Sequence, residues 1–290
     1  MRALLDGAVD YAGLSPPAQL TMVAAVREYA AQRASDDAWM LGRFVVGAAK
    51  LGEFAREAEP LFTPGGELWA LSVLIGPEPA ADIAAVAAFN AAHRGAMCDM
   101  LEAKAATPED VTRIAAAARG TGLPVYVEVP AAGNPAPLID AIASRGLRAK
   151  VRTGGVTPDA FPAPGEVVGF FTTCLRTGVA FKATAGLHHP LRGEYALTYD
   201  AASPRGAMYG FLNVFLAVAL LRDGGSASDA EALLTERDPR AFQFGAEGVR
   251  WRDALLLTPR LAQARDRAVV SFGSCSFAEP VAGLRELSLL

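Results

Sequence analysis

Basic clusters, paired cysteines and long hydrophobic runs are all missing from this sequence of 290 residues. Its 27 lysines and arginines are outnumbered by 31 aspartates and glutamates, which gives a net charge of −4 at pH 7. Binding to a nucleic-acid backbone requires a basic stripe, so no nucleic-acid partner is expected. The three cysteines include no CxxC pair, which argues against a disulfide framework or a zinc ribbon and fits a reducing cytoplasm.

The apolar segments are too short for a membrane span or a signal peptide. The most apolar one, residues 208–221, contains Asn213 and is interpreted as a buried helix. Asp6 and Asp10 interrupt the N-terminal segment before the apolar core of a signal peptide could form. We therefore expect a cytoplasmic protein without a membrane partner. What the chain does have is 52% hydrophobic residues and only 20% charged ones, a composition typical of a well-buried globular protein.

Short β-rich runs alternate with longer helical runs along the chain. The expected strands are residues 40–46, 68–76, 97–104, 124–130, 147–155, 179–187, 241–245 and 269–277, each followed by a helix. A further amphipathic helix is expected over residues 17–32, and the Asp10–Tyr11 segment is expected to plug or border the barrel. The pattern predicts an α/β fold, a single (β/α)8 TIM barrel over residues 1–290, with an N-terminal helix and a long loop after the sixth strand. No GxGxxG motif follows the first strand, so a Rossmann fold is not favoured.

Polar side chains fall at the carboxyl ends of these strands, where the active sites of barrels lie. Because side chains alternate along a strand, Val125, Val127 and Val129 should face the helices and leave Tyr126 and Glu128 inside. The same alternation groups Glu102 with Lys104, Lys150 with Arg152 and Gly154, and Lys182 with Thr184. These residues form either a substrate site or a structural ion network that fills the barrel.

Two segments carry a family resemblance. Residues 182–187, KATAGL, resemble the sixth-strand signature of the deoxyribose-phosphate aldolases, and FGSCS at 272–276 is similar to the phosphate-binding eighth strand of that family. The resemblance implies a class I aldolase in which Lys182 forms a Schiff base and Gly273, Ser274 and Ser276 hold an anion at a helix N-terminus. The family's second lysine, on strand seven, is replaced here by Gln243. The segment HHPLRGEYALTYD is also outside the family pattern, which favours a distinct subfamily with a different substrate.

Imine formation requires the ammonium form of the lysine to be destabilised by burial or by a neighbouring cation. Lys150 and Arg152 are the expected cations beside Lys182. Glu128 is the first candidate for proton transfer and His188 the second. Lys182 could instead bind a substrate anion, or serve only a structural role.

Three further features each allow a functional and a structural interpretation. The RTGG segment that contains Arg152 and Gly154 is either a phosphate or carboxylate cradle or a glycine-rich turn. His188 and His189 are proton donors or substrate contacts, or else a structural pair. They lack HxH or HExxH spacing, so no metal is expected. Cys275 is expected to be buried and inert rather than a nucleophile.

The leading prediction is a lyase of the class I aldolase type, acting without a cofactor on a small anionic carbonyl compound. The alternatives are a transferase, isomerase or decarboxylase that uses lysine and arginine as an anion clamp without an imine, and a non-catalytic barrel that binds a metabolite or a partner. A homodimer is possible. The expected catalytic residues are Lys182, Glu128, Lys150 and His188, and the expected substrate contacts are Arg152, Gly154, Thr184, Tyr126, Glu102, Lys104, His189, Gly273, Ser274 and Ser276.

Overall fold

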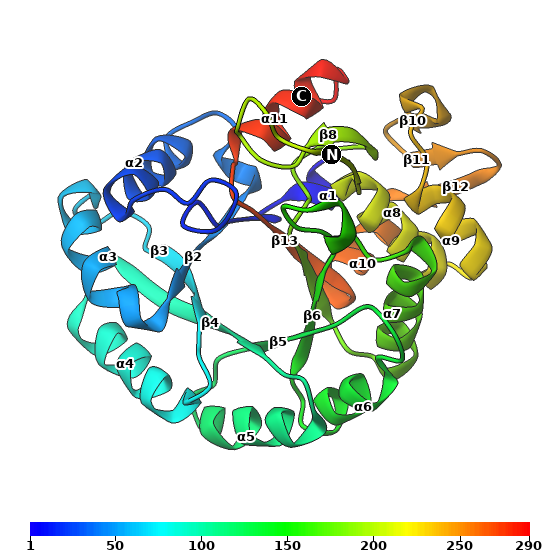
Figure 1. Ribbon diagram of the computed structural model, residues 1–290. Coiled ribbons are helices and arrows are strands. Elements are labelled where there is room, and N and C mark those ends of the chain that lie inside the picture. Colours follow the sequence, from blue (N-terminus) through cyan, green and yellow to red (C-terminus); the bar gives the residue numbers. More distant parts are fainter.

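The computed structural model describes residues 1–290 and contains a closed barrel of parallel strands inside a ring of helices (Figure 1). Around the barrel the strands are β1 (Val9–Tyr11), β2 (Leu41–Gly47), β3 (Trp69–Leu74), β4 (Ala96–Lys104), β5 (Val125–Val129), β6 (Arg148–Arg152), β7 (Phe181–Thr184) and β13 (Val269–Ser274). Parallel pairing of β13 with β1 closes the barrel. The predicted α/β class and (β/α)8 TIM barrel are confirmed.

The assignment of residues 241–245 to the barrel was wrong. β10 (Phe242–Phe244) pairs antiparallel with β11 (Gly248–Trp251), which pairs with β12 (Ala254–Leu257). Figure 1 shows this small sheet outside the ring of helices, next to α9. The missing barrel strand is β1, which had been expected to be a plug or border. It lies between β2 and β13, so the strand that carries Lys182 is the seventh around the barrel and not the sixth.

The helices of the ring begin and end where local signals predict. α5 (Pro108–Ala118) begins with a capping box, in which Thr107 Oγ1 accepts from the backbone of Asp110 and the Asp110 carboxylate accepts from the backbone of Thr107. α7 (Pro164–Thr177) ends at Gly178, whose φ of 71° is left-handed. The other helices are α1 (Arg2–Leu5), α2 (Met22–Arg33), α3 (Leu51–Ala58), α4 (Pro79–Ala92), α6 (Ala136–Ser144), α8 (Phe211–Arg222), α9 (Ala227–Leu234), α10 (Thr258–Arg267) and α11 (Ala278–Glu286).

The apolar run near residue 210 forms helix α8, and every residue from Phe211 to Leu220 is buried. Asn213, the polar residue within this buried stretch, is fully paired: its side-chain oxygen accepts from the backbone of Arg192, and its amide donates to the carbonyls of Leu233 and Glu236. The interpretation as a buried helix is therefore correct. None of the helices combines the length and the apolar character that crossing a bilayer demands.

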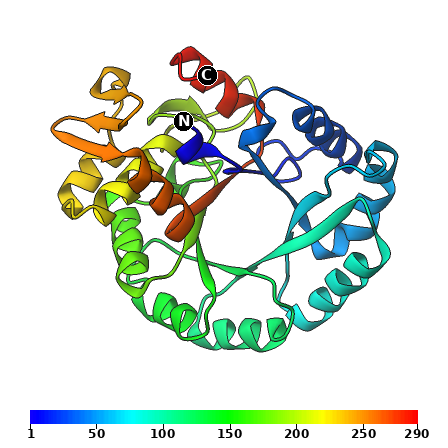
Figure 2. The same ribbon diagram turned by 180° about the vertical axis from the view of Figure 1, so that it is seen from behind.

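The segment after β7 is more ordered than the expected long loop. It contains β8 (Gly193–Ala196) and β9 (Arg205–Met208), which pair antiparallel. Leu197 and Met208 of this hairpin line a cavity at the barrel mouth. Figures 1 and 2 show both chain termini on the side of the ring where β8 and α11 lie.

Candidate active site

Five charged side chains of alternating sign form one continuous row across the barrel, which we call the charge chain. Lys182 Nζ lies 2.5 Å from Asp10 Oδ2 and 2.6 Å from Glu102 Oε1. Lys150 Nζ lies 2.6 Å from Glu102 Oε2 and 2.9 Å from Glu128 Oε2. All five residues are buried, with at most 8% of any of them exposed. The structure thus joins four predicted site residues to Asp10, which sequence reasoning had not assigned to the site.

Strand register explains why these side chains meet. Glu128 of β5 pairs with Lys150 of β6, and Lys150 pairs with Lys182 of β7. Glu102 of β4 pairs with Tyr126 instead, and its carboxylate reaches both ammonium groups. It also accepts from Ser72 Oγ at 2.5 Å. Two adjacent lysines that would otherwise repel each other are therefore bridged by one carboxylate.

Asp10 is held in place from three sides. Its Oδ1 accepts from the backbone of Arg43 at 3.0 Å, and its Oδ2 accepts from Ser271 Oγ at 2.8 Å and from Lys182. A Cβ at Gly42 would lie only 2.7 Å from Asp10 Oδ1, so a larger residue at this position would displace the carboxylate. These contacts direct Asp10 into the barrel, toward the end of the charge chain.

The charge chain favours the charged forms of its three central members, Lys182, Glu102 and Lys150. Burial opposes the ammonium form of Lys182, but the carboxylates of Asp10 and Glu102 outweigh it and raise the pKa of Lys182. Burial likewise opposes the charged form of Lys150, yet Glu102 and Glu128 raise its pKa. For Glu102 burial favours the neutral acid, but Lys150 and Lys182 lower the pKa below its ordinary value.

The directions of these pKa shifts contradict one expectation from the sequence. Lys150 was expected to destabilise the ammonium form of Lys182, but the carboxylates between and beside the two lysines dominate. The raised pKa of Lys182 is the opposite of what an imine-forming lysine requires, because only the neutral amine attacks a carbonyl.

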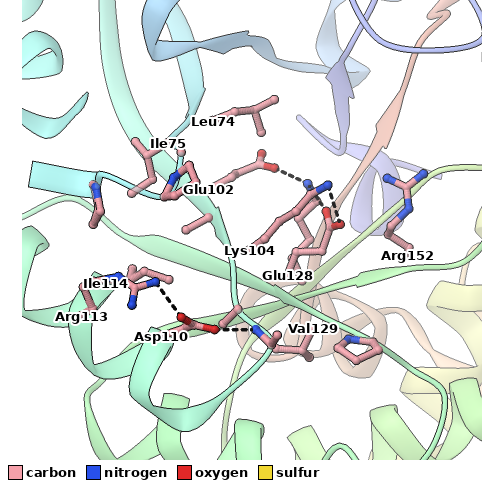
Figure 3. A pocket seen from close by; sticks show the side chains of 18 residues that line it. Leu74, Ile75, Glu102, Lys104, Asp110, Arg113, Ile114, Glu128, Val129 and Arg152 are labelled. Atoms are coloured by element: carbon pink, nitrogen blue, oxygen red, sulfur yellow. Dashed lines mark hydrogen bonds and ion pairs between the residues drawn. The ribbon is translucent and has the colours of Figure 1, made fainter. Parts of the chain in front are cut away.

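Positive charge that can reach a substrate comes from two other residues. Three carboxylates and two ammonium groups leave the charge chain with one net negative charge. The side chain of Lys104 is 79% exposed and lies 3.8 Å from Glu128. Arg152 is exposed and makes no side-chain hydrogen bond or ion pair, and Figure 3 shows it apart from the paired groups. Arg152 is therefore the cation that is free to bind an anion.

Two connected cavities open at this end of the barrel. The large cavity, about 740 Å³, lies over the ends of β3 to β6, and the small cavity, about 350 Å³, lies over β1, β2, β7 and β13. Lys182, Thr184, Gly273 and His188 line the small cavity. The two cavities share Leu74, Glu102, Lys104, Glu128, Lys150 and Arg152. The open end of the charge chain therefore lies at their junction, and Figure 3 shows its carboxylates, Glu102 and Glu128, in the lining of the large cavity.

Two expected substrate contacts are covered by protein. A Cβ at Gly154 would lie 2.4 Å from the ring of Phe161, so this ring fills the space where the expected cradle would hold an anion. Tyr126 has no exposed surface, and its hydroxyl accepts from Arg148 at 2.8 Å. Gly154 thus allows a close contact with the ring, and Tyr126 packs inside the barrel.

The adjacent histidines contact different partners. His188 Nδ1 lies 2.8 Å from Glu279 Oε2, and its ring contacts Cys275. Burial opposes its protonation, but hydrogen bonds to Cys275 and Glu279 raise the pKa of His188 to about 9. The ring of His189 stacks on Tyr195 with centroids 3.5 Å apart, and burial lowers its pKa to about 4. At neutral pH His188 is charged and His189 is neutral.

The serines of the expected anion site around β13 bind backbone groups of the protein itself. Gly273 allows close packing of β13 on β7, since a Cβ there would lie 2.7 Å from Thr184 Oγ1. Ser274 Oγ accepts from the backbone of Ser276, and Ser276 Oγ accepts from the backbone of Glu279. The first turn of α11 carries Glu279, whose negative charge would repel a phosphate at this helix N-terminus.

Comparisons with known proteins add little to this description. No family model matches the chain, and no curated protein matches it significantly. Among solved structures, the alpha subunit of tryptophan synthase from Legionella pneumophila str. Paris is similar, with a TM-score of 0.37 and 12% identity over 89% of this chain and 91% of that one. A likeness of this size says nothing about substrate or reaction.

Proposed function

We propose that the chain is an enzyme that moves a proton on a small anionic carbonyl compound without forming an imine. The observation that carries the proposal is the open end of the charge chain, where Glu128 and Lys150 lie beside the unpaired Arg152 at the junction of two cavities. Interiors of this fold are normally filled by valine, isoleucine and leucine, and buried charges are costly. A row of five buried charges at the catalytic end of a barrel therefore favours a chemical role.

Each residue at the junction has a distinct task in this proposal. Arg152 binds the carboxylate or phosphate of the substrate, since a guanidinium can donate two parallel hydrogen bonds to such a group. Lys104 adds positive charge at the rim. Lys182 keeps its proton, because Asp10 and Glu102 hold it as an ammonium ion.

The proton transfer itself is assigned to Glu128 and Lys150. The Glu128 carboxylate takes a proton from the carbon next to the carbonyl, and the electrons of the broken C–H bond move toward the carbonyl oxygen. The Lys150 ammonium group stabilises the resulting enolate. Isomerases and decarboxylases of carbonyl compounds pass through such enolates, and these are the reaction classes that we favour.

A lyase of the class I aldolase type is the second candidate. Lys182 lines the small cavity beside Thr184, so a carbonyl group in that cavity could approach its Nζ. An imine would require Lys182 to lose a proton and its contacts with Asp10 and Glu102. This cost places the Schiff-base mechanism behind the proton-transfer mechanism.

Deuterium exchange separates these candidates. We expect the protein, incubated in D₂O with a panel of 2-oxo acids and phosphorylated ketones, to exchange the hydrogen next to the carbonyl of at least one compound. Glu128→Gln should slow this exchange by about 10²- to 10⁴-fold, the usual contribution of a general base. Glu109→Gln, on the exposed surface of α5, is the matched control and should exchange at the wild-type rate. The readout is proton NMR of the substrate.

Borohydride is then added to the same mixtures, and the protein is analysed by mass spectrometry. The proposal expects exchange without a protein adduct. An adduct on Lys182 would support the aldolase instead. Binding with neither exchange nor adduct would indicate a non-catalytic barrel.

A further inference from the structure

The large cavity has two chemically different sides. Its charged side is the open end of the charge chain with Lys104 and Arg152. The remaining side chains that line it are mostly apolar and come from the end of β3 and the start of α4, from α5, and from the end of β5. We call the apolar residues that line only this cavity the apolar wall: Ile75, Pro77, Pro79, Ile114, Val129 and Pro130. Figure 3 shows Leu74, Ile75, Ile114 and Val129 around the same space as the carboxylates.

The apolar wall offers no free charge to a ligand. Apart from the charge chain and Lys104 and Arg152, the charged residues that line this cavity are Arg113 and Asp110, which form an ion pair at 2.6 Å. Asp110 also accepts the backbone hydrogen bonds of the capping box of α5, so the pair is held by the helix. A polar substrate group placed here would lose water without gaining a charged partner.

The size of the large cavity exceeds the needs of a two- or three-carbon metabolite. Its volume of about 740 Å³ is within the range of sites that enclose drug-sized ligands. Leu74 is 37% exposed at its edge, whereas Ile114 and Val129 are 3% and 2% exposed and form its base. An apolar group bound here would remove this surface from water.

We propose that the substrate is an anionic carbonyl compound that carries an aromatic or branched alkyl group, and that the apolar wall binds this group. The inference rests on the proposed function for the anionic head, which Arg152 would hold at the junction. The apolar group then extends from the junction toward Ile75 and Ile114. The apolar wall determines which substrates bind tightly, and Glu128 and Lys150 of the charge chain carry out the proton transfer.

Two acids that differ only by a phenyl ring test this inference. Phenylpyruvate and pyruvate share the 2-oxo acid head, and isothermal titration calorimetry measures both affinities. We expect phenylpyruvate to bind at least about 30-fold more tightly, the effect of burying one aromatic side group. Ile75→Gln, at a residue that lines only the large cavity, should reduce this preference to below about 10-fold, while the affinity for pyruvate stays unchanged.

The controls separate this inference from the proposed function. Val156→Gln introduces the same side chain at an apolar residue that lines only the small cavity, so the preference for phenylpyruvate should persist. Arg152→Gln should weaken both acids by the same factor. Equal binding of both acids to the wild type, or loss of the preference in Val156→Gln, would overturn the apolar wall while leaving the exchange experiment valid. Failure of both acids to bind, together with no exchange of any compound, would overturn the proposed function as well.

Discussion

Lys182→Met should lower the free energy of unfolding by about 3–5 kcal/mol at pH 7, since it leaves buried carboxylates without their cation. Lys182 is 1% exposed and is the only ammonium group that contacts Asp10. Lys104→Met is the matched control, because the same substitution at a side chain that is 79% exposed should change stability by less than about 0.5 kcal/mol. Urea unfolding followed by circular dichroism measures both values.

The loss of unfolding free energy in Lys182→Met depends on pH because the carboxylates titrate. Because the folded protein lowers the pKa of Glu102, the ion pair contributes stability above the ordinary value of 4.5 and loses it as the pH falls through the folded pKa. The wild type therefore loses more stability than Lys182→Met on acidification below pH 4.5, and the difference between them narrows. Equal stabilities of Lys182→Met and Lys104→Met at pH 7 would contradict the conclusion that Lys182 stabilises the buried carboxylates of the charge chain.

Tyr11→Ala should destabilise the protein by about 3–5 kcal/mol, the usual cost of removing a buried aromatic side chain. Tyr11 has no exposed surface; its ring packs against Tyr29 and Phe44, and its hydroxyl donates to Glu28 at 2.7 Å. These contacts attach β1 to α2 and β2, and so they hold the strand that closes the barrel.

The control for Tyr11→Ala is the same substitution at Tyr199, which is 57% exposed after the β8 strand. Tyr199→Ala should change the free energy of unfolding by no more than about 0.5 kcal/mol. Thermal or urea unfolding of the two variants under the same conditions measures both changes in stability. If the N-terminal segment were only a border of the barrel, the two tyrosines would give similar small losses.

Most of the barrel could be predicted from the sequence because its longer strands show clear patterns. The alternation along β5 predicts that Tyr126 and Glu128 lie inside the barrel, and the structure buries both, with Glu128 bonded to Lys150 of the charge chain. The capping signal at Thr107 likewise marks the start of α5 where the structure has it.

The closing strand could not be identified in the same way. β1 has three residues, too few for a periodic pattern, whereas AFQF alternates well and was assigned to the barrel instead. In β1 the acidic Asp10 stands between the apolar Val9 and the aromatic Tyr11. This short alternation is the signal that could have placed Asp10 inside the barrel.

The pairing of the charges depends on distances that a sequence does not contain. Asp10 and Lys182 are 172 positions apart, and only barrel closure through β1 and β13 brings them together. The sequence therefore identifies Lys182 as unusual but does not give the sign of its pKa shift. That sign decides between an ammonium ion that stays charged and an amine that attacks a carbonyl.

Titration of lysine side chains by NMR tests this central point most directly. In protein labelled with ¹³Cε-lysine, the signal lost in Lys182→Arg identifies Lys182. We expect this signal to stay at its ammonium position up to at least pH 10.5, while ordinary lysines titrate at about 10.4. Because the pKa of Lys182 is raised, its stabilising charge is complete below the ordinary value of 10.5 and disappears only at higher pH. A Lys182 signal that titrates below pH 8 would contradict the account and would favour the imine-forming lysine.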